Sequence, residues 1–267
     1  MTFPCSLPCV LSIAGFDNCG GAGIQADLKT FYALGCHGAS VLTVLPIQNT
    51  CGVRSIFTLP DKCVEEQLEA VFDDIKVDAI KIGVLYSKSN VQAVVNILTK
   101  YPTIPVVLDP VMGSSTGTVL LEEGVLEAMV NTLFPLVKVL TPNLNEASTL
   151  VGKPVVARNE MEWAAKKLSK KGPLAVLIKG GHLLGDSCED CLFFEDRVFW
   201  LSEKRVKSQN THGTGCTLSS AVAAYLAKGF DVPEAVKEAK KYLSRCLQVG
   251  LPFKVGLGKG PVNLVKQ

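Results

Sequence analysis

Charged residues are scarce in this 267-residue chain, at 19%, and their signs nearly cancel to a net charge of +2. A balance this close to neutral gives no electrostatic case for binding nucleic acid or an anionic membrane. The chain has no run of 18 apolar residues, so we expect no membrane-spanning helix. The N-terminus also lacks a basic start followed by a cleavable apolar stretch, so we expect a cytoplasmic protein.

Several signatures of metal, disulfide and nucleotide sites are missing as well. The ten cysteines occur without a signal peptide, which favours reduced thiols over disulfides. Cys188-Glu-Asp-Cys191 has no second pair and no adjacent histidine, so we interpret it as a polar hairpin bend and not as a zinc site. The glycine-rich residues 15–23 lack the Gly-Lys-Ser/Thr of a P-loop and the spacing of the dinucleotide fingerprint.

Hydrophobic residues, by contrast, make up 48% of the chain, and we expect residues 1–267 to form a single domain with one large core. Apolar strands are predicted at 10–15, 39–46, 79–85, 106–112, 137–140 and 175–179, with a hairpin at 193–206. Helices are predicted between them, among others at 64–75, 89–98, 122–133, 160–171 and 232–249. This alternation predicts a doubly wound, mostly parallel α/β sandwich of three layers.

The most informative stretch is Thr211-His-Gly-Thr-Gly-Cys216, which directly precedes a helix of small residues that stops at Gly229. Such a turn exposes backbone N–H groups at the positive end of a helix, which suits a phosphate or a developing anion. At this position the pKa of the Cys216 thiol is expected to fall and its thiolate to become accessible. The alternative is a capping loop in which Cys216 is a small buried hydrophobic residue.

Polar side chains also follow several of the predicted strands. Gln48 offers the donor and acceptor that match the edge of a flat heterocycle, or it belongs to a simple turn. Asn143 and Glu146 have the spacing of a helix-capping box, although Glu146 and Asp109 also suit a phosphate-bound magnesium ion. Lys179 ends a buried strand, where its charge is costly unless it meets an anion. Because ligands bind beyond the carboxyl ends of such strands, we expect these residues to gather there.

Seven motifs of this kind occur in register: Ala14-Gly-Phe-Asp-Asn-Cys-Gly-Gly-Ala-Gly-Ile-Gln-Ala-Asp27, Gln48-Asn-Thr, Lys81-Ile-Gly83, Asp109-Pro-Val-Met112, Thr141-Pro-Asn-Leu-Asn-Glu146, Lys179-Gly-Gly-His182 and Thr211-His-Gly-Thr-Gly-Cys216. Together they resemble the hydroxymethylpyrimidine/phosphomethylpyrimidine kinases of thiamine synthesis, a branch of the ribokinase-like superfamily, over about residues 10–262. The resemblance implies a ribokinase-like homodimer that uses ATP and Mg²⁺. It would phosphorylate hydroxymethylpyrimidine and its monophosphate to the diphosphate.

The resemblance also implies roles for individual residues. Cys216 would deprotonate the attacking oxygen of the substrate, and charge on the transferred phosphoryl group would be stabilised by the amides of Gly213, Thr214 and Gly215. Asp109 and Glu146 would lie near the magnesium ion and the ATP phosphates. The nucleotide side would be formed by Thr141, Asn143 and Lys179. Gln48 would read the pyrimidine ring, and the remaining pocket wall would comprise Gly15, Asp27, Val84 and Val111.

The chain departs from the family pattern near the expected ring pocket. Phe16 stands where serine is frequent, and Val84 stands where methionine is frequent. Gly113 and Ser114 replace bulkier residues, and the tail lacks the usual histidines. A pyridoxal kinase of the same branch is therefore the alternative function, with Cys216 also able to add to the ring aldehyde. A catalytically silent vitamer-binding protein is disfavoured because the residues for catalysis are all present.

Overall fold

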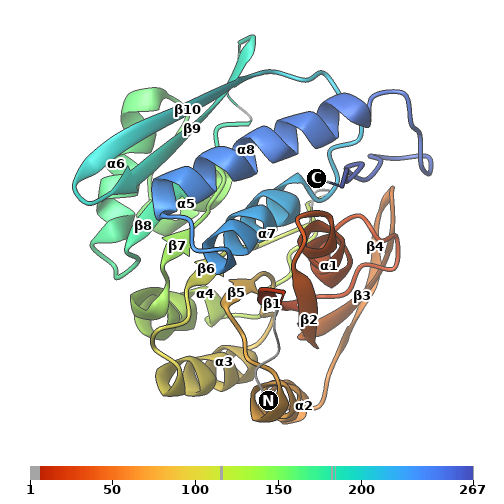
Figure 1. Cartoon of the computed structure of the whole chain (residues 1–267), viewed down its shortest axis with the longest axis vertical. Helices are drawn as coiled ribbons and strands as arrows, with labels where there is room; N and C mark the ends of the chain where they lie inside the picture. The colour runs from red at the N-terminus through yellow and green to blue at the C-terminus, as the bar shows by residue number, and fades with distance from the viewer. Residues whose placement is uncertain (1–6, 115–116, 182, 184, 267) are drawn as a thin grey trace.

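The computed structural model describes residues 7–114, 117–181, 183 and 185–266. At its centre lies an eight-stranded sheet in the order β10-β9-β8-β7-β6-β5-β1-β2 (Figure 1). Strands pair in parallel from β2 to β8, and the antiparallel hairpin of β9 and β10 extends the sheet beyond β8. The strands are β1 (Cys9–Ala14), β2 (His37–Leu42), β5 (Ala79–Ile82), β6 (Val106–Leu108), β7 (Val139–Leu140), β8 (Ala175–Ile178), β9 (Ser187–Phe194) and β10 (Arg197–Lys204). The predicted mostly parallel sheet is confirmed.

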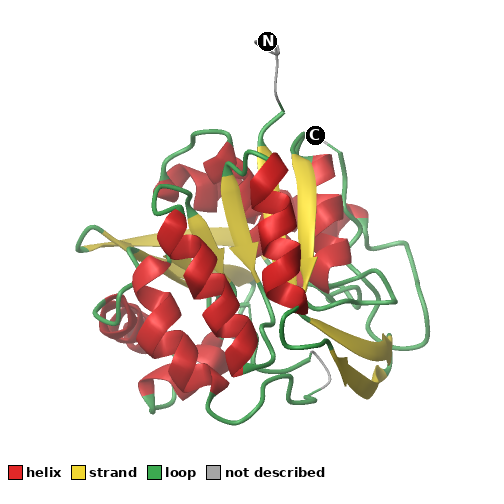
Figure 2. Cartoon of the chain, turned by 90° about the horizontal axis from the view of Figure 1, so that it is seen from below, coloured by secondary structure: helices red, strands yellow, loops and turns green. Residues whose placement is uncertain are grey.

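Helices cover both faces of this sheet (Figure 2). One face packs against α1 (Gly23–Ala33), α7 (Thr214–Ala227) and α8 (Val232–Val249). The other packs against α2 (Cys63–Asp74), α3 (Lys88–Lys100), α4 (Val125–Ala128), α5 (Leu144–Val151) and α6 (Arg158–Ser169). A π-helical turn, Met129–Leu133, and a 3-10 turn, Phe134–Leu136, follow α4. The arrangement is the three-layer sandwich expected from the sequence.

The central strands supply both cores because successive side chains of a strand point to opposite faces. Val10 and Val107 belong to the core under α1, α7 and α8, whereas Leu11 and Leu108 belong to the core under α2 to α6. All four side chains are fully buried. Strands covered on both faces read as continuous apolar runs, which explains why these strands were found in the sequence.

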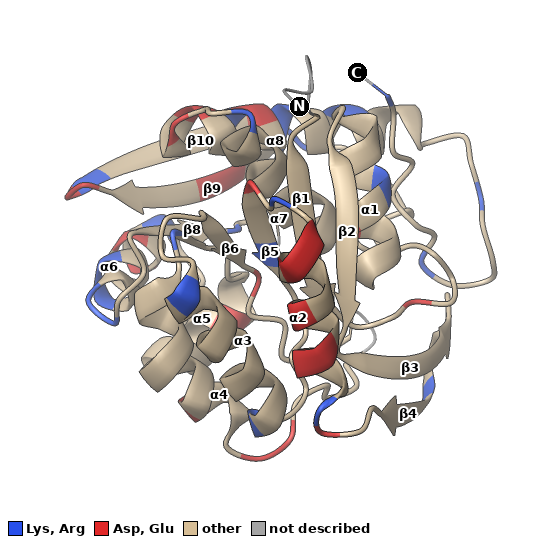
Figure 3. Cartoon of the chain, turned by 60° about the horizontal axis from the view of Figure 1, so that its bottom comes forward, with Lys and Arg blue, Asp and Glu red and all other residues tan. Residues whose placement is uncertain are grey.

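Helix ends follow local signals. Ser87 and Asp231 accept backbone N–H groups at the start of α3 and α8, and Asn143 and Glu146 form the predicted capping box of α5. The acidic residues of α2, red in Figure 3, are exposed to solvent. Within the described residues, none of the helices combines the length and the apolar character needed to cross a membrane.

The strand predicted at 39–46 is wrong, because the chain leaves the main sheet at Thr43. The Thr43 N–H donates to Ala14 O, and the hydroxyl donates to Val84 O over 2.6 Å. β2 therefore ends at Leu42, and the chain continues in a separate two-stranded sheet of β3 (Val44–Asn49) and β4 (Gly52–Thr58). We did not predict β4.

The second hairpin also begins earlier than predicted. Its turn lies at Glu195 and Asp196, which both have positive φ. The first strand of the hairpin, β9, starts at Ser187, six residues before the predicted start. Cys188 and Cys191 consequently lie within a strand and not in a hairpin bend. The nine cysteines among the described residues are all free. β5 and β6 are shorter than predicted, which places Asp109 directly after a strand end.

Candidate active site

The carboxyl ends of the parallel strands open into a pocket of about 620 Å³. Twelve of the fourteen residues singled out in the sequence line it: Gly15, Gln48, Val84, Asp109, Val111, Asn143, Glu146, Lys179, Gly213, Thr214, Gly215 and Cys216. The other two, Asp27 and Thr141, are fully buried and lie outside the lining. His182 lies outside the described residues. The expected convergence at this edge of the sheet is confirmed.

The turn before α7 presents an open helix N-terminus to this pocket. Gly213 has φ of 82°, and no side chain caps the helix. A side chain at Gly213 would overlap the carbonyl oxygen of Gly21, so glycine is required by both the backbone angle and the contact. A Cβ on Gly215 would lie 3.2 Å from Asp109 Oδ2 and 3.4 Å from Lys179 Nζ. The backbone of this turn therefore lies directly against the charged part of the pocket, where its amides can receive an anion.

Asp109, Glu146 and Lys179 form a charged cluster across three strand ends. Lys179 Nζ lies 2.5 Å from Asp109 Oδ1 and 3.8 Å from Glu146 Oε2. Burial alone would lower the pKa of Lys179, but the Asp109 and Glu146 carboxylates outweigh it and raise the pKa. Burial raises the pKa of Glu146 to about 7, although Lys179 acts against this. The strand-end lysine thus has the anionic partner that its position required.

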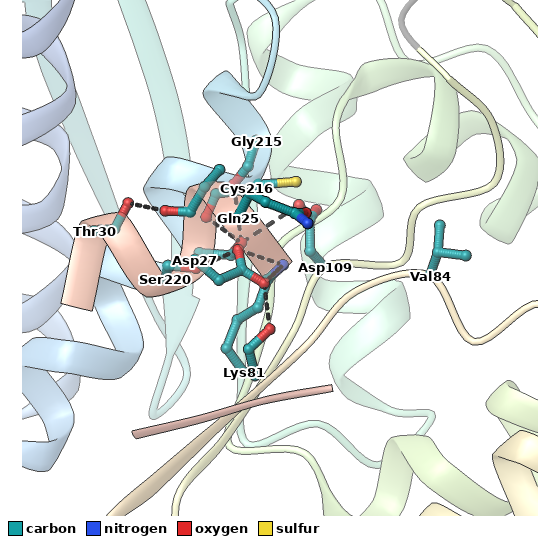
Figure 4. A network of polar contacts seen from close by, with 12 residues as sticks. Gln25, Asp27, Thr30, Lys81, Val84, Asp109, Gly215, Cys216 and Ser220 are labelled. Atoms are coloured by element: carbon teal, nitrogen blue, oxygen red, sulfur yellow. Dashed lines mark hydrogen bonds and ion pairs between the residues drawn. The ribbon is translucent and has the colours of Figure 1, made fainter. Parts of the chain in front are cut away.

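Asp27 is a buried anchor and does not form the pocket wall that we predicted. Its Oδ1 accepts from Lys81 and Ser220 at 2.9 and 2.7 Å, and its Oδ2 accepts from Lys81 and Ser12 at 2.8 and 2.6 Å (Figure 4). These four hydrogen bonds occupy both oxygens, so little acceptor capacity is left for a ligand. The carboxylate ties α1 to β1, β5 and α7 beneath the pocket.

Lys81 is a site residue that we did not single out. Its ammonium group is fully buried yet reaches the pocket floor. Burial would lower its pKa, but the Asp27 carboxylate outweighs this and raises it. A lysine inside the apolar strand 79–82 was a signal for a buried ion pair, but its partner lies 54 residues away in the chain. Thr141 is buried in a similar way, with its hydroxyl 3.4 Å from Asp109 Oδ1.

The expectation that the Cys216 pKa falls is wrong. Cys216 is half-buried near the start of α7. Burial raises the pKa of its thiol to about 11, Lys81 works in the opposite direction, and Asp27 and Asp109 add to the rise. Figure 4 places the thiol among these groups. Desolvation thus outweighs the lysine and the backbone hydrogen bond from Gly23.

We predict that Cys216 reacts slowly with iodoacetamide at neutral pH in the absence of substrates. With a pKa of about 11, roughly one thiol in 10⁴ is ionised at pH 7, and only the thiolate is nucleophilic. The reaction rate should rise up to about pH 11. Mass spectrometry of the peptide that contains Cys216 measures this, with the exposed Cys51 as the internal comparison. A plateau already at pH 8 would contradict the raised pKa.

The other end of the pocket is more apolar. Val84 packs with Val44 and Leu120, and Val111 contacts this cluster. Gln48 lies within β3, not after a strand end as predicted. Its backbone N–H donates to Asn18, whereas its side-chain Nε2 is 3.5 Å from the Phe16 carbonyl, a long contact that holds the amide weakly. An aromatic ring that carries polar groups could lie between these apolar side chains and this amide.

Comparison with known proteins agrees with this geometry. Residues 17–263 match the family model described as phosphomethylpyrimidine kinase. A hydroxymethylpyrimidine/phosphomethylpyrimidine kinase of Rhizobium meliloti is 44% identical over 255 residues, which cover 95% of this chain and 95% of that kinase. The thiamine biosynthesis bifunctional protein ThiED of Geobacter sulfurreducens is 45% identical over 254 residues, which cover 95% of this chain but 51% of that protein. The chain thus spans about half the length of this bifunctional relative.

A solved structure shares the fold as well as the sequence. The pyridoxal kinase from Staphylococcus aureus, in complex with AMP-PCP and pyridoxal, superposes with a TM-score of 0.88 at 34% identity, covering 97% of this chain and 93% of that chain. The ribokinase-like architecture is therefore confirmed. With the family model matching nearly the whole length and the kinase pocket in place, the chain belongs to the phosphomethylpyrimidine kinase family.

Proposed function

We propose that the chain phosphorylates 4-amino-5-hydroxymethyl-2-methylpyrimidine and its monophosphate to the diphosphate in thiamine biosynthesis, with ATP as the phosphate donor. The observation that carries this is one continuous pocket with two unlike ends. Gln48, Val84 and Val111 form an end suited to a small polar ring. Lys179 and the α7 turn form an end suited to phosphates. The names of the relatives, as enzymes of thiamine biosynthesis and of pyrimidine phosphorylation, support the same assignment.

Phosphoryl transfer requires alignment, charge stabilisation and an acceptor for the proton of the attacking oxygen. Cys216 would accept that proton, and the amides of Gly213, Thr214 and Gly215 would stabilise the phosphoryl group as charge develops. Lys179 would leave Asp109 to pair with the nucleotide phosphates, with Asn143 beside them. Thr141 is buried, so we assign it to orienting Asp109 and not to contacting ATP.

The acidic pair fits a magnesium ion. Asp109 and Glu146 both line the pocket, and Gly215 leaves room beside Asp109 Oδ2 that a side chain would fill. Among the described residues no group of three or more acidic, histidine or cysteine side chains could enclose a metal. Mg²⁺ is commonly held by one or two carboxylates together with substrate phosphates, so this donor set suits it. When bound, the ion would neutralise phosphate charge.

A vitamin B6 kinase is the second candidate, favoured by the similarity to the pyridoxal kinase of S. aureus. The test is a single-turnover reaction of the protein with Mg-ATP and hydroxymethylpyrimidine, its monophosphate or pyridoxal, with products identified by mass spectrometry. We expect the pyrimidine diphosphate. Pyridoxal phosphate as the only product would assign the second function. Binding of these vitamers without turnover would mean a silent binding protein.

Replacing Gln48 with leucine should raise KM for the pyrimidine by about tenfold or more while KM for ATP changes little. Losing the hydrogen bonds that match a ring edge weakens recognition of that ring alone, by about 1.5–3 kcal/mol if a charged or well-formed bond is lost. Steady-state kinetics with each substrate varied in turn measure this. Gln92→Leu, an exposed glutamine on α3, is the matched control. Equal rises in both KM values would instead assign Gln48 a structural role.

We further propose that residues 1–267 act as one domain, as a homodimer and in the cytoplasm. The resemblance to the family supports the dimer. The net charge of +2 supports small-molecule partners over nucleic acid. Sedimentation of the purified protein tests the dimer.

A further inference from the structure

Two glycine-rich segments that lie almost 200 residues apart in the chain meet behind the anion-binding turn. The backbone of Gly213 lies against the carbonyl of Gly21, and a Cβ on Gly213 would overlap that carbonyl oxygen. A Cβ on Gly21 would lie 2.6 Å from His212 Cδ2 and 2.8 Å from Pro261 Cβ. The place of the α7 turn is therefore set by the loop between β1 and α1.

Asp17 organises that loop. Its carboxylate accepts the backbone N–H groups of Cys19, Gly21 and Ala22 at 2.9, 3.0 and 2.7 Å. It is almost completely buried. Burial would raise the pKa of Asp17, but the hydrogen bond from His212 and the backbone N–H groups outweigh it and lower the pKa to about 2. Asp17 is thus ionised at neutral pH and shapes the segment that ends where α1 begins.

His212 completes the link. Its Nε2 lies 2.8 Å from Asp17 Oδ2, and since an ionised carboxylate only accepts, this nitrogen carries the hydrogen. The backbone on either side of the ring is fixed as well, because His212 N–H donates to Gly260 O and Val262 N–H donates to His212 O. The next residue is Gly213, which starts the turn. Side chain and backbone together hold this turn from two directions.

We propose that Asp17 and His212 are a positioning pair that holds the α7 turn, and with it the amides and Cys216, in register with the loop before α1. The inference rests on the proposed phosphoryl transfer. Asp17 lies outside the pocket lining, and although His212 lines the pocket, its Nε2 is bonded to Asp17, so we assign both to holding the backbone. Catalysis by fixed amides depends on alignment, and a displacement of about 1 Å can cost on the order of 10²-fold in rate.

The test compares His212→Ala with His212→Gln, which keeps an N–H donor at a similar reach. His212→Ala should lower kcat by about 10²-fold with KM for both substrates nearly unchanged, and His212→Gln should recover most of the loss. Asp17→Asn should resemble His212→Ala, because the asparagine NH₂ group would replace one carboxylate oxygen and could not accept the N–H groups that this oxygen accepts. The matched controls are His37→Gln, an exposed histidine on β2, and Asp231→Asn, the cap of α8. Both should retain kcat.

Thermal unfolding separates misfolding from misalignment. If His212→Ala does not fold, Gly21→Ala takes its place, since the added Cβ displaces the histidine ring without removing either side chain of the pair. It should lower kcat in the same direction. A folded His212→Ala with unchanged kcat, or His212→Gln no better than His212→Ala, would overturn the proposal. If the unsubstituted protein transfers no phosphate, the proposed function fails instead, whatever the variants do.

Discussion

Alanine at position 216 should lower turnover by about 10²–10⁴-fold, the usual contribution of a general base. The thiol is at the mouth of the α7 turn, in the pocket that holds Asp109 and Lys179, and the substitution removes only one polar atom from a half-buried position. The variant should therefore fold normally. Single-turnover rates with Mg-ATP and the pyrimidine monophosphate measure the loss of the chemical step directly.

Cys63→Ala is the matched control for this measurement. Cys63 is also half-buried and also lies in the first turn of a helix, α2, but it is remote from the pocket lining. It should leave turnover unchanged. Near-normal turnover in Cys216→Ala would remove this thiol from the mechanism, and the amides of the turn would then have to carry catalysis without a cysteine base.

The raised pKa of Cys216 sets a condition on this role. A general base works best when its pKa is near the operating pH, whereas burial raises the pKa of this thiol to about 11. Asp109 is one of the charges that raise it. Neutralising Asp109 would therefore lower the pKa of Cys216. The charged cluster and the thiol are thus electrostatically coupled.

Much of the site could be predicted because it depends on strand ends. Asp109 and Lys179 follow apolar runs that are buried on both faces, and parallel strands bring their carboxyl ends to one edge. The capping box of Asn143 and Glu146 is local in sequence, so it too was found. Features set by contacts within a few residues, or by the common direction of the strands, can be predicted from the sequence alone.

Features set by distant partners were not accessible. Whether 39–46 is one strand depends on tertiary contacts, and in the structure the Thr43 hydroxyl between β2 and β3 donates to Val84 O, 41 residues away in the chain. Asp27 could equally face a ligand or a buried lysine, and only the fold shows that Lys81, Ser12 and Ser220 surround it. The prediction of a lowered pKa for Cys216 was wrong for the same reason. A helix N-terminus is visible in the local sequence, whereas the burial that raises this pKa depends on the whole fold.

Lys81→Met should destabilise the protein by about 3–5 kcal/mol, because it leaves the Asp27 carboxylate buried without its cation. That is a large share of a typical stability of about 5–15 kcal/mol. Urea unfolding followed by circular dichroism measures the loss. Lys241→Met is the matched control, since Lys241 pairs with Glu238 at the surface, where solvent screening leaves such pairs with little effect on stability.

The double variant Lys81→Met/Asp27→Asn decides whether charge or packing is responsible. Removing both charges should restore part of the stability, because a neutral amide can still bond Ser12 and Ser220 without an unpaired buried charge. If the double variant is as unstable as Lys81→Met alone, the lysine stabilises through its packed side chain.

Restored stability with a slower alkylation of Cys216 would mean that Lys81 also favours the thiolate, because its charge acts against the rise in the pKa of Cys216. One buried pair would then support both the fold and the base.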